Sequence, residues 1–405
     1  MNYIIFEDLK SNNLKPFSLN HASFEIRCGL YSNIERISKI IGSEDKLYLI
    51  VRPDIEDLIR QKFNNCIVNP KIIPKGFFLN GATIWDRGLI NNLEVGKSYS
   101  NNGSLIAINN PNSTDLDDFY KLLEDSIQVT LDISVMHISY IWDLIFNISD
   151  VIKSDLNHSD DFIAISNIDI SSSQLENFHS SIIINRSENI FIHDEIEIGA
   201  GVVLDASDGP IVIDKYAKID IGALIKGPIY IGRRSIINPG AKLRGNISIG
   251  PMCKIGGELE DVVIQGYTNK QHDGYLGHSF LGEWINLGAN TNNSDLKNNY
   301  SNIRMKISKD LEINTLKQFL GSCIGDYTRT GISTMLNSGT FIGLGANVFG
   351  SDFQDKYIES FQWGREDKTD FEKFISTCVK MKERRNSELS KIEIELLKQI
   401  YNSID

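Results

Sequence analysis

Several features that would place the chain in a specialised class are missing from its 405 residues. The five cysteines are scattered and include no C-x-x-C pair, so neither a disulfide framework nor a zinc ribbon is supported. No run of 18 apolar residues occurs, and Met1 is not followed by a basic segment and a long apolar stretch. We therefore expect an unexported protein of the reducing cytoplasm that does not contact a membrane.

Positive charge is also in short supply. The 41 Lys and Arg residues face 53 Asp and Glu residues, which gives a formal charge of −12. This balance argues against a protein that coats nucleic acid, and any phosphate site must be local. Proline is rare, with 9 residues against 31 glycines, whereas 41% of the chain is hydrophobic. A disordered chain is excluded, and the glycine excess needs an explanation.

A six-residue repeat supplies that explanation. Eight aliphatic residues in succession occupy every sixth position: Ile213, Ile219, Ile225, Ile231, Ile237, Leu243, Ile249 and Ile255. Chance would produce such a run roughly once in a thousand starting points. One inward aliphatic side chain every six residues, with glycines beside it, is typical of a parallel β-helix whose glycines lie at the corners.

The remaining chain divides around this block. Residues 1–120 alternate apolar strand-like runs with helical stretches and predict an α/β domain. Residues 121–185 predict a helical connector, residues 186–350 the β-helix, and residues 351–405 a C-terminal helical extension. In that extension Thr369 with Glu372, and Ser390 with Glu393, indicate capping boxes that open two short helices.

The repeat slips out of phase near Asp261, and polar chemistry concentrates there. Amides, glycines and His272 crowd the segment from Gln265 to Tyr300. A regular coil does not require so many amides, so this interruption is the candidate site.

The interruption carries a family resemblance. His272, the Tyr275-Leu-Gly that follows, Asn286 followed by Leu-Gly-Ala289, and the Asn299-Tyr300 pair stand at matched offsets. With the repeats, residues 190–350 closely resemble the acetyltransferase domain of the bifunctional N-acetylglucosamine-1-phosphate uridyltransferase/glucosamine-1-phosphate acetyltransferase family. The whole chain looks most like its divergent Bacteroidetes-type branch of sugar nucleotidyltransferases. The resemblance implies an α/β nucleotidyltransferase-like domain joined to a left-handed, homotrimeric β-helix of hexapeptide repeats.

The same resemblance implies roles for individual residues. His272 would be the general base that deprotonates the attacking amine, a task that suits an imidazole. Tyr275 and Asn286 would hold an amino-sugar phosphate, and Asn299 with Tyr300 would orient the amine or acetyl group. Ala289 would meet coenzyme A through its backbone, and Arg244 would clamp the phosphate.

One position departs from the family pattern. Where the family has a phosphate-binding lysine this chain has Glu260, which would repel a sugar phosphate. Lys270, Lys297 or Arg304 would have to compensate, or the acceptor differs.

The N-terminal domain lacks the usual glycine-rich nucleotide loop, since no glycine occurs before Gly29. Lys15-Pro16-Phe17-Ser18 followed by Arg27-Cys-Gly29 resembles an element of the divergent branch. Arg27 would contact a phosphate and Asp8 would lie near Mg²⁺. A buried structural arginine and a surface aspartate are equally good interpretations, so nucleotidyl transfer stays open.

Three functions follow. The leading one is acetyl-CoA-dependent N-acetylation of an amino-sugar 1-phosphate, with a second nucleotidyltransferase activity that makes UDP-N-acetylglucosamine. The alternatives are a sugar nucleotidyltransferase whose β-helix only oligomerises, and a non-catalytic trimeric scaffold that binds sugar nucleotides.

Overall fold

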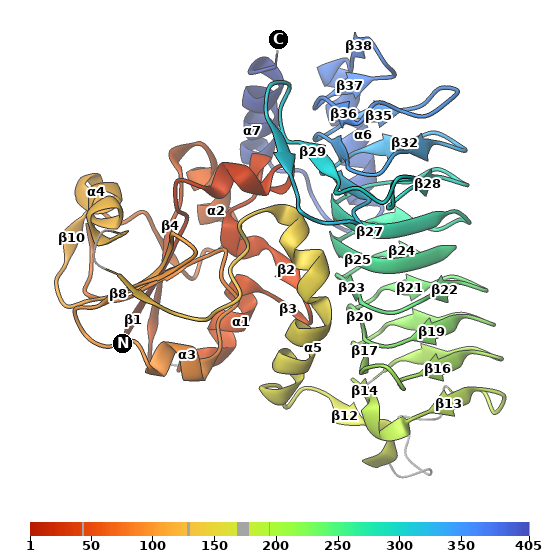
Figure 1. Ribbon diagram of the computed structural model, residues 1–405, viewed down its shortest axis with the longest axis horizontal. Helices are drawn as coiled ribbons and strands as arrows, with labels where there is room; N and C mark the ends of the chain where they lie inside the picture. The colour runs from red at the N-terminus through yellow and green to blue at the C-terminus, as the bar shows by residue number, and fades with distance from the viewer. Residues whose placement is uncertain (43, 128–129, 168–177, 194, 405) are drawn as a thin grey trace.

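The computed structural model describes residues 1–42, 44–127, 130–167, 178–193 and 195–404. A mixed α/β unit lies beside a tall stack of short strands, and a helical segment runs between them (Figure 1). No helix in these ranges is both long and apolar enough to cross a bilayer.

The N-terminal unit is built on a seven-stranded sheet of order β11-β8-β9-β7-β1-β4-β5. The central strands β1, β4 and β7 are parallel, and β9 runs antiparallel to β7. The strands are β1 (Asn2–Phe6), β4 (Lys46–Ile50), β5 (Ile67–Val68), β7 (Gly76–Asn80), β8 (Ser98–Asn101), β9 (Ser104–Asn110) and β11 (Thr130–Asp132). The helices around it are α1 (Asn33–Ile40), α2 (Glu56–Lys62), α3 (Arg87–Asn91) and α4 (Leu116–Ile127).

The segment between the two units is only partly helical. β11 joins the N-terminal sheet beyond residue 120, where the sequence analysis places a boundary. A 3-10 segment (Ile141–Asn147) and α5 (Ile148–Asn157) then pass between the sheet unit and the strand stack. Residues 128–129 and 168–177 of the predicted connector lie outside the described residues.

The strand stack is a parallel β-helix with three faces, as the six-residue repeat predicts. The first face contains β14 (Ile190–Ile192), β17 (Ile211–Ile213), β20 (Ile229–Ile231), β23 (Ile247–Ile249), the ends of β25 (Glu258–Gly266) and β27 (Tyr275–Glu283), β31 (Ser322–Ile324), β34 (Thr340–Ile342) and β36 (Tyr357–Ile358). The second contains β15 (Glu197–Ile198), β18 (Lys218–Ile219), β21 (Ile236–Ile237), β24 (Lys254–Ile255), β26 (Asn269–Lys270), β32 (Arg329–Thr330), β35 (Asn347–Val348) and β37 (Gln362–Trp363). The third contains β13 (Ile183–Asn185), β16 (Val203–Asp205), β19 (Leu224–Lys226), β22 (Lys242–Leu243), the starts of β25 and β27, β28 (Asn292–Asn293) and β33 (Met335–Leu336).

All eight residues of the predicted repeat point into this prism and are at most 2% exposed. On the first face the inward column runs in register from Ile192 through Ile213 and Ile264 to Ile358. Each coil therefore stacks aliphatic side chains on those of the previous coil, and apolar burial stabilises the stack.

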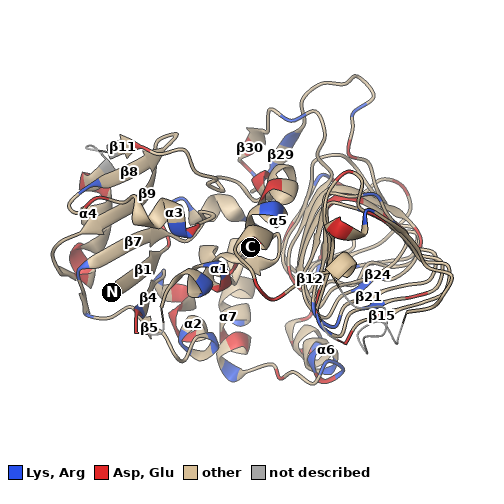
Figure 2. Cartoon of the chain, turned by 90° about the horizontal axis from the view of Figure 1, so that it is seen from below, with Lys and Arg blue, Asp and Glu red and all other residues tan. Residues whose placement is uncertain are grey.

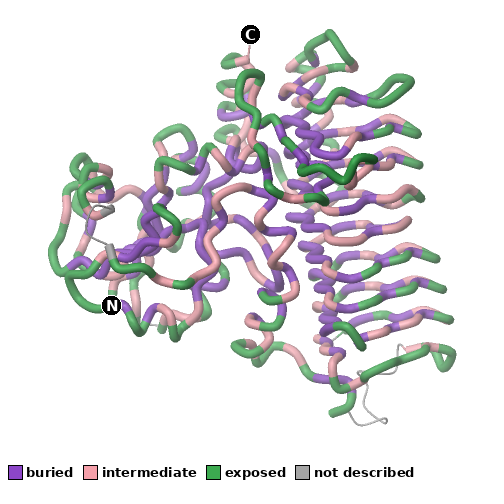
Figure 3. The backbone as a smooth tube through the Cα atoms, viewed as in Figure 1, coloured by how far each residue is buried: buried purple, intermediate pink, exposed green. Residues whose placement is uncertain are grey.

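The outer side of the first face is also apolar. Val212, Tyr230, Val263 and Phe280 are buried against residues 141–157 in one core cluster. Burial on both sides makes the first-face strands purple along their length, whereas the turns on the far side of the stack are exposed (Figure 3). This packing fixes the N-terminal unit on the first face of the β-helix.

Two C-terminal helices complete the fold, α6 (Phe371–Glu383) and α7 (Lys391–Asn402). Ser390 caps α7 through Glu393, as expected, but α6 is capped by Asp370. The Thr369 prediction is wrong by one residue, because the Asp370 carboxylate accepts the hydrogen bond from the Lys373 amide at 2.9 Å. α6 packs on the β-helix on the side away from β29 (Arg304–Lys306) and β30 (Glu312–Asn314) (Figure 2).

Candidate functional site

His272 lies in a turn between the second and third faces, and we call this corner of the prism the His272 edge: residues 256–257, 271–274, 288–291 and 331–334. The His272 side chain is exposed, and its carbonyl oxygen accepts a hydrogen bond from Lys270 Nζ at 2.5 Å. Gly257, one coil away, has φ +78° and no room for a Cβ, which would come 2.7 Å from that carbonyl. The turn is tightly held while the imidazole stays open to solvent.

Lys270 holds this turn from inside the prism. It continues the inward column of Ile237 and Ile255, and its side chain is 1% exposed. Its ammonium donates to the carbonyl oxygens of Gly256 and His272. Burial lowers the pKa of Lys270 to about 8, although Asp273 acts in the opposite direction. Its ammonium faces the interior, so this lysine is not available on the surface to compensate for Glu260.

Tyr275 and Arg244 lie on the outer side of the third face: Tyr275 directly follows the His272 edge, and Arg244 lies at the opposite end of the face, before the turn to the first face. The Tyr275 hydroxyl donates to Asp295 Oδ2 at 2.8 Å, and burial together with this carboxylate raises the pKa of the phenol. Arg244 is paired with Glu258 at 2.9 Å and with Glu260 at 3.2 Å. The glutamate that departs from the family pattern therefore engages the arginine expected to clamp phosphate.

A polar ladder that sequence reasoning missed lies at the corner between the third and first faces. His278 contacts Asp295 through Nδ1 at 2.9 Å and Asp261 through Nε2 at 3.4 Å. Burial would raise the pKa of Asp295, but hydrogen bonds from His278 and Tyr275 outweigh it and lower that pKa. The residues Asp261, His278 and Asp295 are each 17 apart, which matches the coil length here. That spacing was the signal available in the sequence.

Asn286 and Ala289 belong to the coil that follows His272, and Ala289 is part of the His272 edge. The Ala289 carbonyl oxygen accepts a hydrogen bond from the Ser333 amide at 2.8 Å. Asn286 is on the second face, where its side chain contacts Asn269 at 3.4 Å. Asn286 is three residues before Ala289, and Tyr275 is three residues after His272. The edge thus has His272 and Ala289 in its turns, with Asn286 on one side and Tyr275 on the other.

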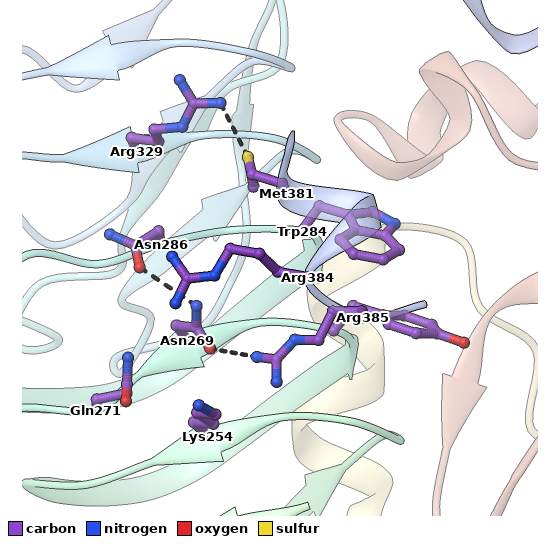
Figure 4. Close-up of a pocket in the computed structure, with 10 residues that line it drawn as sticks. Lys254, Asn269, Gln271, Trp284, Asn286, Arg329, Met381, Arg384 and Arg385 are labelled. Atoms are coloured by element: carbon purple, nitrogen blue, oxygen red, sulfur yellow. Dashed lines mark hydrogen bonds between the residues drawn. The ribbon is translucent and has the colours of Figure 1, made fainter. Parts of the chain in front are cut away.

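A cavity of about 320 Å³ opens over Asn286, between the second face and α6. Figure 4 shows Arg384 and Arg385 extending from the end of α6 toward Asn286 and Asn269. Arg385 donates to Asn269 Oδ1 at 2.7 Å, and Arg329 contacts the Met381 sulfur at 3.0 Å. Among the described residues no carboxylate forms an ion pair with Lys254, Arg329, Arg384 or Arg385. We call this cavity the Asn286 pocket, and its four cations suit a phosphate-bearing ligand.

Asn299 and Tyr300 lie elsewhere, on the excursion of residues 294–321 that leaves the third face and returns to the first. Tyr300 is 66% exposed, and Asn299 Oδ1 accepts from the Ser301 amide at 3.1 Å. Neither is joined to His272 by a hydrogen bond or ring contact within the described ranges. Lys297 and Arg304 make their contacts inside the same excursion, with Asn302 and Glu312.

The two N-terminal candidates are also separated. Asp8 follows β1, and its carboxylate accepts hydrogen bonds from the Lys10 amide and Asn80 Nδ2, both at 3.0 Å. In the described chain Asp8 belongs to no group of three or more His, Cys, Asp and Glu side chains that could hold a metal ion. Mg²⁺ is usually held by one or two carboxylates together with substrate phosphates, so Mg²⁺ beside Asp8 stays a prediction that requires a bound nucleotide. Arg27 instead packs on the β-helix, bonded to Gln265 and paired with Glu35 at 2.8 Å.

One cluster could hold a metal ion by geometry: His21, Glu283 and Asp326 place ligand atoms within 4.8 Å of one another. His21 Nε2 lies 2.8 Å from Asp326, and Lys62 Nζ lies 3.4 Å from its Nδ1. Burial and Lys62 lower the pKa of His21, but Asp326 and Glu25 outweigh them and raise it to about 10. A protonated imidazole beside an ammonium balances these carboxylates, so the cluster works as an ionic contact between the N-terminal unit and the β-helix.

Comparison with known proteins covers parts of the chain. "Bifunctional protein GlmU" of Methanococcus vannielii is 29% identical over 102 residues, which are 25% of this chain and 24% of that protein. The "Bifunctional sugar-1-phosphate nucleotidylyltransferase/acetyltransferase" of Sulfurisphaera tokodaii is 32% identical over 98 residues, 24% of each protein. The chain thus spans about a quarter of the length of these curated relatives.

A solved Bacillus cereus structure covers 55% of this chain and 91% of its own, at 14% identity and a TM-score of 0.19, and so low a similarity does not bear on function. The family model described as "Sugar nucleotidyl transferase" matches residues 3–161, which are the N-terminal unit and its connector. The N-terminal part of the chain is therefore similar to sugar nucleotidyl transferases, and about a quarter of the chain is similar to a bifunctional sugar-1-phosphate nucleotidylyltransferase/acetyltransferase.

Proposed function

We propose that the chain is an acetyl-CoA-dependent N-acetyltransferase that acts on an amino-sugar 1-phosphate in the cytoplasm. The observation that carries this proposal is the His272 edge, where an exposed imidazole stands on a rigid turn between Tyr275 and Asn286. One of the two partial relatives is named a bifunctional sugar-1-phosphate nucleotidylyltransferase/acetyltransferase, which supports a transferase.

In the proposed reaction His272 removes a proton from the sugar amine as the amine nitrogen attacks the thioester carbonyl of acetyl-CoA. The new C–N bond forms, the C–S bond breaks, and the proton passes on to the departing thiolate of coenzyme A. Tyr275 and Asn286 orient the sugar phosphate, and the Ala289 backbone lies along the donor. The cations of the Asn286 pocket are suited to the phosphates of the donor.

Arg244 gives this proposal a specific requirement. Its partners Glu258 and Glu260 already neutralise it, so a sugar phosphate must compete with two carboxylates. Asn299 and Tyr300 do not reach His272 within one chain, so we propose that they act across a subunit boundary or are not used.

We also propose a homotrimer. Apolar side chains are exposed on and beside the His272 edge: Ile221 55%, Ile332 80%, Met335 37%, Phe349 40% and Phe353 55%. Ile332 follows Ala289 by one coil, so a neighbour that covers these side chains would also wall the site.

The match of residues 3–161 to sugar nucleotidyl transferases favours a second activity, formation of a nucleotide sugar with release of pyrophosphate. One assay tests both activities: glucosamine 1-phosphate, acetyl-CoA and UTP are mixed with the protein, and free thiol and pyrophosphate are measured separately. Thiol release that depends on the amino sugar supports acetyl transfer. Pyrophosphate without thiol would leave the β-helix as an oligomerising element, and neither product would leave a binding scaffold.

A further inference from the structure

A second and larger cavity lies where the three parts of the chain meet. Its volume is about 840 Å³, and we call it the junction cavity. The N-terminal unit contributes Arg27 and Lys39, the corner between the first and second faces contributes Arg233 and Arg234, and the segment after α6 contributes Arg385. The volume is in the range of cavities that bind small molecules.

The lining of this cavity has six Lys and Arg residues against the three carboxylates Glu35, Asp161 and Asp214, whereas the whole chain has a formal charge of −12. Arg27 and Lys39 are paired with Glu35 and Asp161 at 2.8 and 2.6 Å. Arg233 and Arg234, by contrast, form no ion pair with any carboxylate in the described part of the chain.

Three cations converge on a single aromatic ring at this corner. The Tyr216 ring centroid lies 5.1 Å from Lys215 Nζ, 5.9 Å from the Arg233 guanidinium carbon and 5.3 Å from that of Arg234. Lys215 is also paired with Glu195 at 3.7 Å, so the tyrosine face and this carboxylate offset only part of the repulsion, and neither guanidinium group has a carboxylate partner in the described part of the chain. An anion with two adjacent charged groups would satisfy both guanidinium groups at once, because each presents a planar array of donors that matches phosphate oxygens.

The junction cavity and the Asn286 pocket are neighbours. Tyr267 and Arg385 line both cavities. Arg385 donates one hydrogen bond to Asn269 Oδ1 at 2.7 Å, and burial lowers the pKa of Arg385. A ligand phosphate in the junction cavity can therefore compete with Asn269 for Arg385.

We propose that the junction cavity is a binding site for a diphosphate ligand, such as a nucleoside diphosphate, with its phosphates on Arg233 and Arg234. Aromatic rings of Tyr31, Phe162, Tyr230 and Tyr267 line the same cavity and give an organic group apolar surface. Such a ligand contacts the N-terminal unit, the β-helix and the C-terminal segment together, and it alters the Asn286 pocket through Arg385.

Isothermal titration of the full chain with UDP, and separately with inorganic pyrophosphate, tests this site. EDTA is present to remove metal-dependent binding at the N-terminal unit. We expect saturable binding of at least one probe, weakened at least tenfold in the Arg233→Gln/Arg234→Gln variant, which removes both charges and keeps polar side chains at both positions. The matched control, Arg186→Gln/Lys226→Gln, removes two exposed cations elsewhere on the β-helix and should bind like wild type.

The two probes separate the sources of the diphosphate. Tighter binding of UDP assigns the site to a nucleotide, whereas equal binding assigns it to the phosphates alone, and both support the proposal. It is overturned if neither probe binds, or if the Arg233→Gln/Arg234→Gln variant binds as tightly as wild type. The titration contains no acyl donor, so its outcome is independent of the proposed acetyl transfer.

Discussion

Replacement of Lys270 by methionine should remove a pH dependence of stability that originates inside the β-helix. Lys270 occupies an inward position that Ile198, Ile219, Ile237 and Ile255 occupy in earlier coils of the same face. Its ammonium has two carbonyl oxygens as acceptors and no carboxylate in direct contact within the described chain. Methionine fills a similar volume without a charge, so Lys270→Met keeps the column packed.

The magnitude follows from the pKa. Burial lowers the pKa of Lys270 from 10.5 to about 8. At about 1.36 kcal/mol per pH unit, this difference corresponds to about 3 kcal/mol of unfolding free energy. Between pH 8 and 10.5 the unfolded chain keeps a proton that the folded chain has released, so the folded state gains stability as the pH rises. Below pH 8 both states are protonated and the full cost of the buried charge is present.

Chemical denaturation of both proteins between about pH 7 and pH 11 measures the effect. Other groups titrate too, and His21 acts in the opposite sense: its pKa of about 10 in the folded state means that its contribution is lost as the pH rises from 6.5 to 10. Because His21 is present in both proteins, the difference between them isolates Lys270. We expect wild type to gain about 3 kcal/mol relative to Lys270→Met across this range. A stability difference between the two proteins that stays constant with pH would refute a buried ammonium without a carboxylate partner at Lys270.

Three further outcomes are expected. Asp326→Asn removes the main partner of His21 and should lower the free energy of unfolding by about 3 kcal/mol at pH 7, but by less above pH 10. Denaturant titration at both pH values measures this, and equal losses of unfolding free energy would show that His21 is not charged. Tyr275→Phe should raise the KM for the amino-sugar phosphate about tenfold with a smaller change in kcat, since one hydrogen bond to a charged group is worth about 1.5 kcal/mol; an unchanged KM would remove Tyr275 from the site. Ile332→Asp should shift sedimentation from trimer to monomer without loss of secondary structure by circular dichroism, because Ile332 is 80% exposed; a monomeric wild type would contradict the proposed interface.

The periodic part of the fold was predictable because its cause is local. A coil that stacks on its neighbour must repeat the inward residue in phase, so Ile213 and the seven residues that follow it identify the prism directly. The same logic fails at Lys270, since a lysine is not expected in an apolar column and the phase slips there. The sequence pattern instead indicates a surface cation at Lys270, where the structure has a buried one.

The structure brings together only those candidate site residues that lie along a single edge. His272, Tyr275, Asn286 and Ala289 come together because consecutive coils place residues about 17 apart side by side. Contacts between the N-terminal unit and the β-helix have no periodic pattern in the sequence. One of them is the pairing of His21 with Asp326, which are 305 residues apart. The junction cavity is of the same kind, since its arginines come from three separate parts of the chain.

The central claim is that His272 is the base for acetyl transfer. The direct test is the rate of thiol release from acetyl-CoA with glucosamine 1-phosphate, measured for wild type, His272→Ala and the control His158→Ala. His158 directly follows α5, and its side chain is exposed. We predict that His272→Ala lowers kcat by about 10² to 10⁴ with unchanged folding and assembly, while His158→Ala behaves as wild type. Undiminished turnover in His272→Ala would contradict the account.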